Sequence, residues 1–345
     1  MHIRSCHALF IALTISSAPA SFAADFSEVS AYIDDSYQRI HLPGAALLVW
    51  KDGEVLHEQF FGAYTADTVI PIASASKWLC AATVMTVVDE GLIDLDAPVS
   101  RYLPSFTGDF AAITVRQCLS LTSGVDERDG GWDWRTTTEA YVNGLAKTPS
   151  LLRAKPGTAV IYGPNGFQIA ARVSEVVTGK SWRELFNERI TGPCDMPNTQ
   201  FGRRGASNNP NVAGGASSTL RDYGHFLEMI ANGGEFRGRR VLSERVISEM
   251  QKNHTAGLKL IKVPPQRRGK EVSYGFGEWI LEKDDAGNAL TVSSPGAFGF
   301  LPWYDRRLNL YGVLMIQQPI SERDNGRFGG ERLIELVRNT VMNGT

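Results

Sequence analysis

A serine and a lysine three positions apart are the residues of this sequence best suited to chemistry. Ser74 and Lys77 lie in the segment 72–78 (IASASKW), at the start of a predicted helix. Positions i and i+3 share one face of a helix, so the lysine nitrogen can reach the serine hydroxyl. A desolvated lysine can accept the hydroxyl proton and make the serine a nucleophile. The competing interpretation is that Ser74 caps the helix and Lys77 is a solvated residue of its first turn.

Other common catalytic motifs are missing from the sequence. There is no G-x-S-x-G elbow, no H-E-x-x-H zinc motif, no G-x-x-x-x-G-K-[ST] phosphate loop and no strand-linked G-x-G-x-x-G. A Ser-His-Asp triad has no local signature here, although its members can be far apart in sequence. The histidines beyond the N-terminal segment are not spaced like metal ligands, which favours structural roles (His41, His57, His225 and His254). We therefore predict neither a metal nor an organic cofactor.

Composition indicates a globular protein and argues against a nucleic-acid partner. The 345 residues are 43% hydrophobic and carry 35 Lys and Arg against 37 Asp and Glu, for a formal charge of −2. Nucleic-acid binding needs a basic face to contact phosphates, and this balance does not favour one. A small-molecule partner is expected instead, and the sequence leaves the oligomeric state open.

The first 23 residues have the pattern of an export signal. Arg4 precedes an apolar run over 8–15, and small residues lead to Ala23, where cleavage is expected. The apolar run is too short to span a bilayer, which takes about 20 residues, and no later segment could do so. We expect residues 1–23 to be removed and 24–345 to work in the periplasm or outside the cell. The three later cysteines lack a C-x-x-C pattern and are interpreted as buried small side chains (Cys80, Cys118 and Cys194).

Hydrophobic periodicity predicts an α+β fold. A helix from Phe26 to about Gln38 precedes strands at 44–50 and 55–61, which flank an Asp-Gly turn. A buried helix follows from Ser74 to Gly91. Further helices are predicted near 165–178, 181–190, 219–231, 243–252 and 328–341, and strands at 274–281, 289–293 and 308–316.

Strands at both ends of the chain predict one antiparallel sheet with helices packed on it. We expect a sheet subdomain of about 24–73 and 271–345, and an inserted helical subdomain of about 74–270. Reactive groups should lie in the cleft where the two meet.

Several ordered motifs resemble the serine beta-lactamase superfamily, class C branch, which also holds D-alanyl-D-alanine carboxypeptidases and beta-lactamase-fold esterases. They cover nearly all of the chain after residue 23. The matching segments are HLPGAA at 41–46, SASK at 74–77, EGLIDLD at 90–96, YLP at 102–104, LTSGV at 121–125, PGT at 156–158, 162–179 and GGASSTLRDY at 214–223.

The resemblance implies roles for the matching positions. Ser74 would be the acylated nucleophile, Lys77 its helical partner, and Tyr162 the third member of the catalytic group. A nearby cation favours a phenolate, so Tyr162 could also serve as base; which of Lys77 and Tyr162 holds the proton at each step stays open. Without the surrounding match, Tyr162 would be interpreted as a core or turn aromatic.

The family's strand motif corresponds to residues 294–300 (SPGAFGF). By resemblance, Gly296 lets the substrate approach the backbone, and the amides of Ser74 and Ala297 form the oxyanion hole. Ser294 takes the position of the family's Lys or His and belongs with Gly296 to the predicted substrate-binding residues. The competing interpretation is a plain edge strand or bulge.

Three departures from the family pattern bear on the substrate. Pro164 replaces the Asn or Ser that follows the tyrosine by two positions, and Asn165, displaced by one, is predicted to contact substrate in its place. Ser294 removes the cation that faces a substrate carboxylate, and Leu121 replaces a histidine interpreted as structural. Retained reactive groups with altered recognition groups indicate acyl-transfer chemistry on a different substrate.

The predicted function is an exported serine hydrolase, foremost an esterase with a small or neutral acyl substrate. A beta-lactamase or D-alanyl-D-alanine carboxypeptidase is the alternative, and would need a substitute cation such as Arg306 or Arg307. A non-catalytic binding protein that kept the fold is the alternative of another class. The segment 132–134 (WDW) could line an acyl pocket or pack as surface aromatics.

Overall fold

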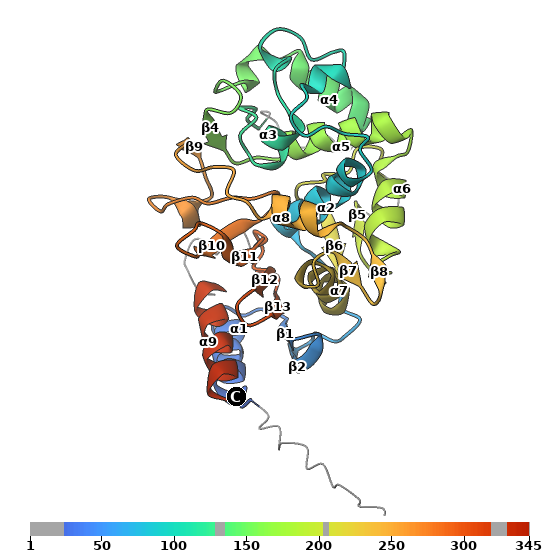
Figure 1. Ribbon diagram of the computed structural model, residues 1–345. Coiled ribbons are helices and arrows are strands. Elements are labelled where there is room, and N and C mark those ends of the chain that lie inside the picture. Colours follow the sequence, from blue (N-terminus) through green and yellow to red (C-terminus); the bar gives the residue numbers. More distant parts are fainter. Residues whose placement is uncertain (1–23, 128–134, 203–206, 319–329, 345) are drawn as a thin grey trace, which may run out of the picture.

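The two ends of the chain meet in one antiparallel sheet, as the sequence predicts (Figure 1). The computed structural model of the protein describes residues 24–127, 135–202, 207–318 and 330–344. The strand order is β10-β11-β12-β13-β1-β2, with bounds Trp279–Lys283, Ala289–Ser293, Leu301–Asp305, Leu310–Met315, Gly44–Lys51 and Glu54–Gly62. Leu48 of β1 pairs with Val313 of β13 and so joins the N-terminal hairpin to the C-terminal meander.

The predicted Asp-Gly turn closes the β1–β2 hairpin. Asp52 and Gly53 have φ angles of 53° and 86°. Positive φ at both central residues defines a type I′ turn, whose twist matches that of the flanking strands. The predicted strands 44–50 and 55–61 are confirmed to within one residue at each end.

The C-terminal meander departs from its prediction in two places. β10 begins at Trp279 instead of residue 274, because the preceding segment turns at Gly277, where φ is 81°. β12, which the sequence pattern does not predict, carries Pro302 inside a strand that is paired on both sides. Proline is rare in such a position because it cannot donate to the ladder, so the pattern concealed this strand.

Two terminal helices cover one face of the sheet. α1 (Ser27–Arg39) and α9 (Gly330–Asn343) lie side by side in Figure 1, the first blue and the second red. Their apolar residues share a core with the sheet; Val29, Val49 and Val337 are among its fully buried members. Both helices agree with their predicted positions.

The opposite face of the sheet carries α7 (Leu220–Ala231), which packs on β13 and β1. Beyond it lies α2 (Ser76–Asp89), preceded by a 3₁₀ turn at Ala73–Ala75. Every residue of α2 from Ser76 to Val88 is buried. A helix that is buried on all sides must run through the core, so whatever α2 carries at its start is held rigidly.

The remaining helices lie in the part of the sequence between β2 and β10, which links the N-terminal strands of the sheet to the C-terminal ones. α5 (Asn165–Thr178) has its predicted bounds and ends at Gly179, which adopts the left-handed conformation at φ 67°. The helix predicted at 181–190 is α6 (Trp182–Phe186) continued by a π-helical turn (Asn187–Thr191). α8 (Glu244–Met250) matches the prediction at 243–252, whereas α3 (Val115–Leu119) and α4 (Thr138–Ala146) have no predicted counterpart.

Short strands tie the helical region together. β4 (Ala159–Ile161) pairs in parallel with β9 (Lys259–Lys262), and β6 (Ala216–Ser218) pairs with β3 (Ile70–Pro71) and β5 (Gln200–Phe201). β7 (Glu235–Phe236) and β8 (Arg239–Arg240) form a hairpin. Runs of two to four residues are too short to show a hydrophobic period, so the sequence does not predict them.

The cysteine interpretation is confirmed. Cys80, Cys118 and Cys194 are buried and unpaired. Within the ranges that the structure describes, no helix combines the length and the apolar character needed to cross a bilayer.

Close packing of α7 on the sheet depends on Gly224. A Cβ atom at this position would lie 1.9 Å from Cη2 of Trp50, and the Trp50 ring is itself stacked on Tyr311 at 5.4 Å between centroids. There is therefore no room for a side chain between helix and sheet.

We expect Gly224→Ala to lower the free energy of unfolding by about 1–3 kcal/mol, the usual cost of overpacking a core. Helix propensity alone would give the opposite sign, a gain of about 1 kcal/mol. Urea denaturation measures the difference, and pairing the change with Trp50→Leu should restore part of the loss. A stabilised single variant would contradict the packing argument.

Candidate active site

Ser74 and Lys77 lie together at the start of the buried helix. Ser74 occupies the 3₁₀ turn that precedes α2, and the Lys77 Nζ atom lies 3.2 Å from its Oγ atom. Ala73, the first residue of the turn, has a φ of 45°, a strained conformation for a residue with a side chain. The turn thus holds the serine at a fixed place before the helix.

Lys77 is not the solvated residue of the competing interpretation, because it is only 4% exposed. Its Nζ atom donates a second hydrogen bond to the Ala213 carbonyl at 2.8 Å and lies 4.7 Å from the centre of the Tyr162 ring. In the part of the chain that the structure describes, no carboxylate forms an ion pair with it. The ammonium group is therefore held by neutral oxygens and ring faces alone.

Tyr162 stands on the turn between β4 and α5, on the other side of Lys77. Its ring stacks on Trp279 at 5.7 Å, and its amide donates to the Lys262 carbonyl at 2.8 Å. The described residues offer no hydrogen-bond partner to its hydroxyl. The structure thus brings Ser74, Lys77 and Tyr162 together, with the phenol oxygen available to a bound molecule.

Gly296 and Ala297 face the same space from the segment that follows β11. A Cβ atom on Gly296 would lie 2.3 Å from the Ile72 carbonyl, so this backbone presses against the chain that leads into Ser74. The Gly296 amide donates to Phe300, whereas the hydrogen bonds of the turn do not use the Ala297 amide. Among the described residues the Ala297 amide has no hydrogen-bond acceptor, so it is available to donate to a substrate oxygen.

Ser294 and Asn165 are placed differently from their predicted role. The Ser294 hydroxyl is buried and donates to the Gly277 carbonyl at 2.7 Å. The Asn165 side chain is fully buried, accepts from the Tyr141 hydroxyl at 2.8 Å and donates to the Asp126 carbonyl. Neither residue lines the cavity that contains Ser74, although the Ser294 hydroxyl also lies 3.4 Å from the Ser74 carbonyl oxygen. Pro164 does line it.

The suggested substitute cations also lie elsewhere. Arg306 binds the Gln251 side chain, and Arg307 pairs with Asp305 and Glu282. Neither arginine lines the cavity. Leu301, at the start of β12, lines it, whereas both arginines follow the other end of that strand. The segment 132–134 lies outside the described residues.

The cavity around Ser74 has a volume of about 750 Å³. Sequence reasoning missed one of its walls, the segment 262–270, which carries four cationic side chains. They are Lys262, Arg267, Arg268 and Lys270. The run Gln-Arg-Arg-Gly-Lys at 266–270 was the available signal, but nothing in the sequence shows that this loop reaches Tyr162.

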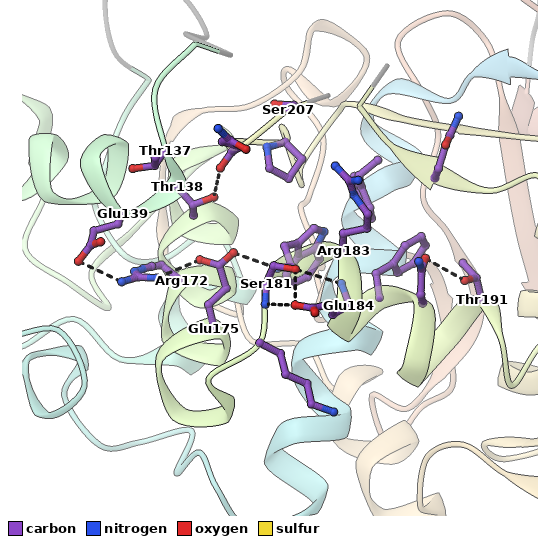
Figure 2. A pocket seen from close by; sticks show the side chains of 18 of the residues that line it. Thr137, Thr138, Glu139, Arg172, Glu175, Ser181, Arg183, Glu184, Thr191 and Ser207 are labelled. Carbon is purple, nitrogen blue, oxygen red and sulfur yellow. Dashed lines mark hydrogen bonds and ion pairs between the residues drawn. The ribbon is translucent and has the colours of Figure 1, made fainter. Parts of the chain in front are cut away.

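A second and larger cavity, of about 1440 Å³, lies beside α5 and α6 (Figure 2). Its charged side chains engage one another: Arg172 pairs with Glu139 and Glu175, and Ser181 bonds to Glu184. None of the predicted reactive residues lines it.

A sheet built from both chain ends, with a Ser-Lys pair at the start of a buried helix above it, is the architecture of the serine beta-lactamases and transpeptidases. The Beta-lactamase family model matches residues 29–334, and the chain belongs to this family of beta-lactamase-fold hydrolases. The fold prediction is thereby confirmed.

Three similar proteins illustrate the range of the family. A crystal structure of a "putative beta-lactamase" from Bacteroides dorei DSM 17855 is 32% identical, with a TM-score of 0.84 over 92% of this chain and 99% of that one. Penicillin-binding protein 4 of Amycolatopsis lactamdurans is 32% identical over 172 residues, 45% of this chain but only 44% of that protein. A family VIII carboxylesterase shares the fold, with 22% identity and a TM-score of 0.72 over 91% of this chain and 97% of that one. The chain thus spans less than half the length of the curated relative.

We expect Gly296→Ala to lower the rate of acylation at Ser74 by roughly tenfold to a hundredfold. The added methyl group has to displace the Ile72 carbonyl or the turn itself, which moves the Ala297 amide relative to Ser74; loss of one such donor commonly costs 10²–10³. Stopped-flow labelling by a fluorophosphonate measures the rate. A folded variant that is labelled as fast as the wild type would contradict this placement.

A buried acid next to Trp279 makes stability depend on pH. Glu278 is fully buried, and neither carboxyl oxygen has a hydrogen-bond partner among the described residues. Burial raises the pKa of Glu278 well above its ordinary value of 4.5. The folded state then holds the proton more tightly than the unfolded state, so stability is lost as the pH rises above 4.5 toward the raised pKa.

We therefore expect Glu278→Gln to gain stability relative to the wild type as the pH rises from 5 to 8. Urea denaturation at both pH values measures the change. Glu244→Gln, at an exposed carboxyl, is the matched control. Its free energy of unfolding should differ from that of the wild type by the same amount at both pH values. An equally constant difference for Glu278→Gln would show that this carboxyl ionises normally.

Proposed function

We propose that the protein hydrolyses an ester or amide bond through an acyl-enzyme on Ser74. The observation that carries the proposal is the 3.2 Å contact between Lys77 Nζ and Ser74 Oγ, with the lysine buried beneath an open cavity. Burial at the start of a rigid helix keeps the amine within reach of the hydroxyl proton, as an activated serine requires.

Ser74, Lys77, Tyr162 and one water molecule account for every proton that moves in the reaction. Ser74 Oγ attacks the acyl carbon while its proton passes to the Lys77–Tyr162 pair, one member of which must be deprotonated, as amine or phenolate, before the attack. The amides of Ser74 and Ala297 stabilise the negative oxygen that forms, and the scissile bond breaks as the leaving group takes up the proton. Water then attacks the acyl-enzyme and gives one proton to the same pair; the acyl–Ser74 bond breaks, the acid is released, and the pair passes that proton to Ser74 Oγ.

Tyr162 is suited to protonate the leaving group. Its ring lies against Lys77, and the described residues leave its hydroxyl free. A phenol that exchanges its proton with a neighbouring amine could deliver it to the departing oxygen or nitrogen. The leaving half of the substrate should then lie on the Tyr162 side of the cavity.

An ester with a small or neutral acyl group is the proposed substrate. The support is that Ser294 replaces the cation of the family's strand motif and binds backbone carbonyls with its hydroxyl. A beta-lactam or a D-alanyl-D-alanine peptide is the alternative; it is favoured by the cations of the segment 262–270 and by the similarity to a penicillin-binding protein. Asn165 and Ser294 are left out of the proposed substrate contacts.

Two further predictions from the sequence are kept as proposals. The signal peptide at 1–23 lies outside the described residues, and we propose export to the periplasm or beyond. The division into a sheet subdomain, about 24–73 and 271–345, and a helical subdomain, about 74–270, is likewise proposed, with the cavity between them.

We expect Ser74 to carry the acyl group. Intact mass after exposure to a p-nitrophenyl ester, a cephalosporin and a fluorophosphonate should show an adduct in the wild type and none in Ser74→Ala. Lys77→Met should acquire the adduct at least about a hundredfold more slowly, the usual contribution of a positioned base. The substrate turned over fastest decides between esterase and beta-lactamase.

Ser76→Ala is the matched control for the identity of the nucleophile. The Ser76 hydroxyl donates to the Ala73 carbonyl at 2.6 Å and accepts from the Ala216 amide, so it is occupied by backbone. This variant should still be labelled. Label on Ser74→Ala would show that another residue is the nucleophile and overturn the Ser74 proposal. No adduct and no turnover with any compound would overturn the hydrolase proposal and favour a binding protein.

A further inference from the structure

The cavity has a cationic wall on a loop that the family's strand motif does not include. In the segment 262–270, Lys262, Arg267, Arg268 and Lys270 all line it. The carboxylates paired with these cations in the described structure are three: Asp126 and Glu127 hold Lys262, and Glu331 is shared by Arg267 and Lys270.

Arg267 is fixed close to the reactive groups. It ends the 3₁₀ turn Pro265–Arg267, and its guanidinium carbon lies 5.3 Å from the centre of the Trp279 ring. The same ring stacks on Tyr162, whose other neighbour is the Lys77 ammonium. Only 15% of the Arg267 side chain is exposed, and one nitrogen lies 3.3 Å from Glu331. The Arg267 guanidinium and the Tyr162 ring therefore both contact the Trp279 ring.

Arg268 supplies charge that no described residue neutralises. Its side chain is exposed at the cavity wall, and it forms no hydrogen bond or ion pair with any described residue. A guanidinium presents paired N–H donors that match the two oxygens of a carboxylate. A fixed arginine beside a free one can bind a single anionic group between them.

We propose that Arg267 and Arg268 form an anion subsite that receives a carboxylate on the leaving half of the substrate. The inference rests on the proposed acyl-enzyme chemistry, because it places the leaving half beside Tyr162. The acyl half can still be small and neutral. In this proposal the cation that Ser294 replaces is supplied from a different loop of the same cavity.

Two esters of the same acid test the subsite. p-Nitrophenyl acetate has a neutral leaving group, and 5-acetoxy-2-nitrobenzoate is the same ester with one added carboxylate. The ratio of kcat/KM for the charged ester to that for the neutral ester should exceed one in the wild type. It should fall about tenfold in the double variant Arg267→Gln, Arg268→Gln, and should also fall as salt is added.

Further variants separate a lost charge from a disturbed fold. Arg267→Lys keeps the charge but loses the paired donors, so it should retain only part of the ratio, whereas Arg268→Gln alone leaves the contact of Arg267 with Trp279 intact and should also lower it. Arg245→Gln is the control, because Arg245 lies on α8 outside the cavity and should leave the ratio unchanged.

The two proposals fail in different ways. If the double variant shows the wild-type ratio while Ser74→Ala is inactive on both esters, the anion subsite is wrong and the hydrolase proposal stands. If Ser74→Ala hydrolyses both esters like the wild type, the acyl-enzyme proposal is wrong. The anion subsite is then wrong as well, because it rests on that proposal.

Discussion

The organisation of this protein depends on one buried ammonium group. Lys77 is held without a described carboxylate partner, by the Ala213 carbonyl, the Ser74 hydroxyl and the ring of Tyr162. Removing an ammonium from water is costly unless its donors are satisfied, so every element that supplies one of these contacts must be in place. Ala213 precedes β6, Ser74 precedes α2, and Tyr162 follows β4. Three separate parts of the helical region therefore converge on one atom.

The sheet provides the rigidity that this convergence needs. β11 leads directly into the segment with Gly296 and Ala297, and Gly277, just before β10, would place a Cβ atom 2.4 Å from the Lys77 carbonyl. Helix α2 is thus in direct backbone contact with the edge of the sheet. Close backbone approach, more than side-chain packing, sets the distance between the reactive turn and the wall opposite it.

The sequence predicted the framework and the contact between Ser74 and Lys77, because both leave local patterns. The Asp-Gly turn, the uniformly apolar α2 and the Ser74–Lys77 spacing follow from neighbouring residues alone. It did not predict β12, where Pro302 conceals a strand, or the placement of Asn165, whose amide is taken by Tyr141 and Asp126. It also missed the loop 262–270, because its approach to Tyr162 depends on the parallel pairing of β4 with β9, a contact between segments about 100 residues apart.

The position of the arginines on that loop has a consequence for how the protein can change. Where a strand beside the nucleophile carries the recognition cation, altering specificity disturbs the same backbone that stabilises the transition state. Here the loop 262–270 meets the reactive groups through an indole ring and one short strand pair. If Arg267 and Arg268 bind the substrate as proposed, substitutions in the loop redirect substrate preference while the geometry around Ser74 stays intact. Selection can therefore act on recognition and on catalysis as largely independent traits.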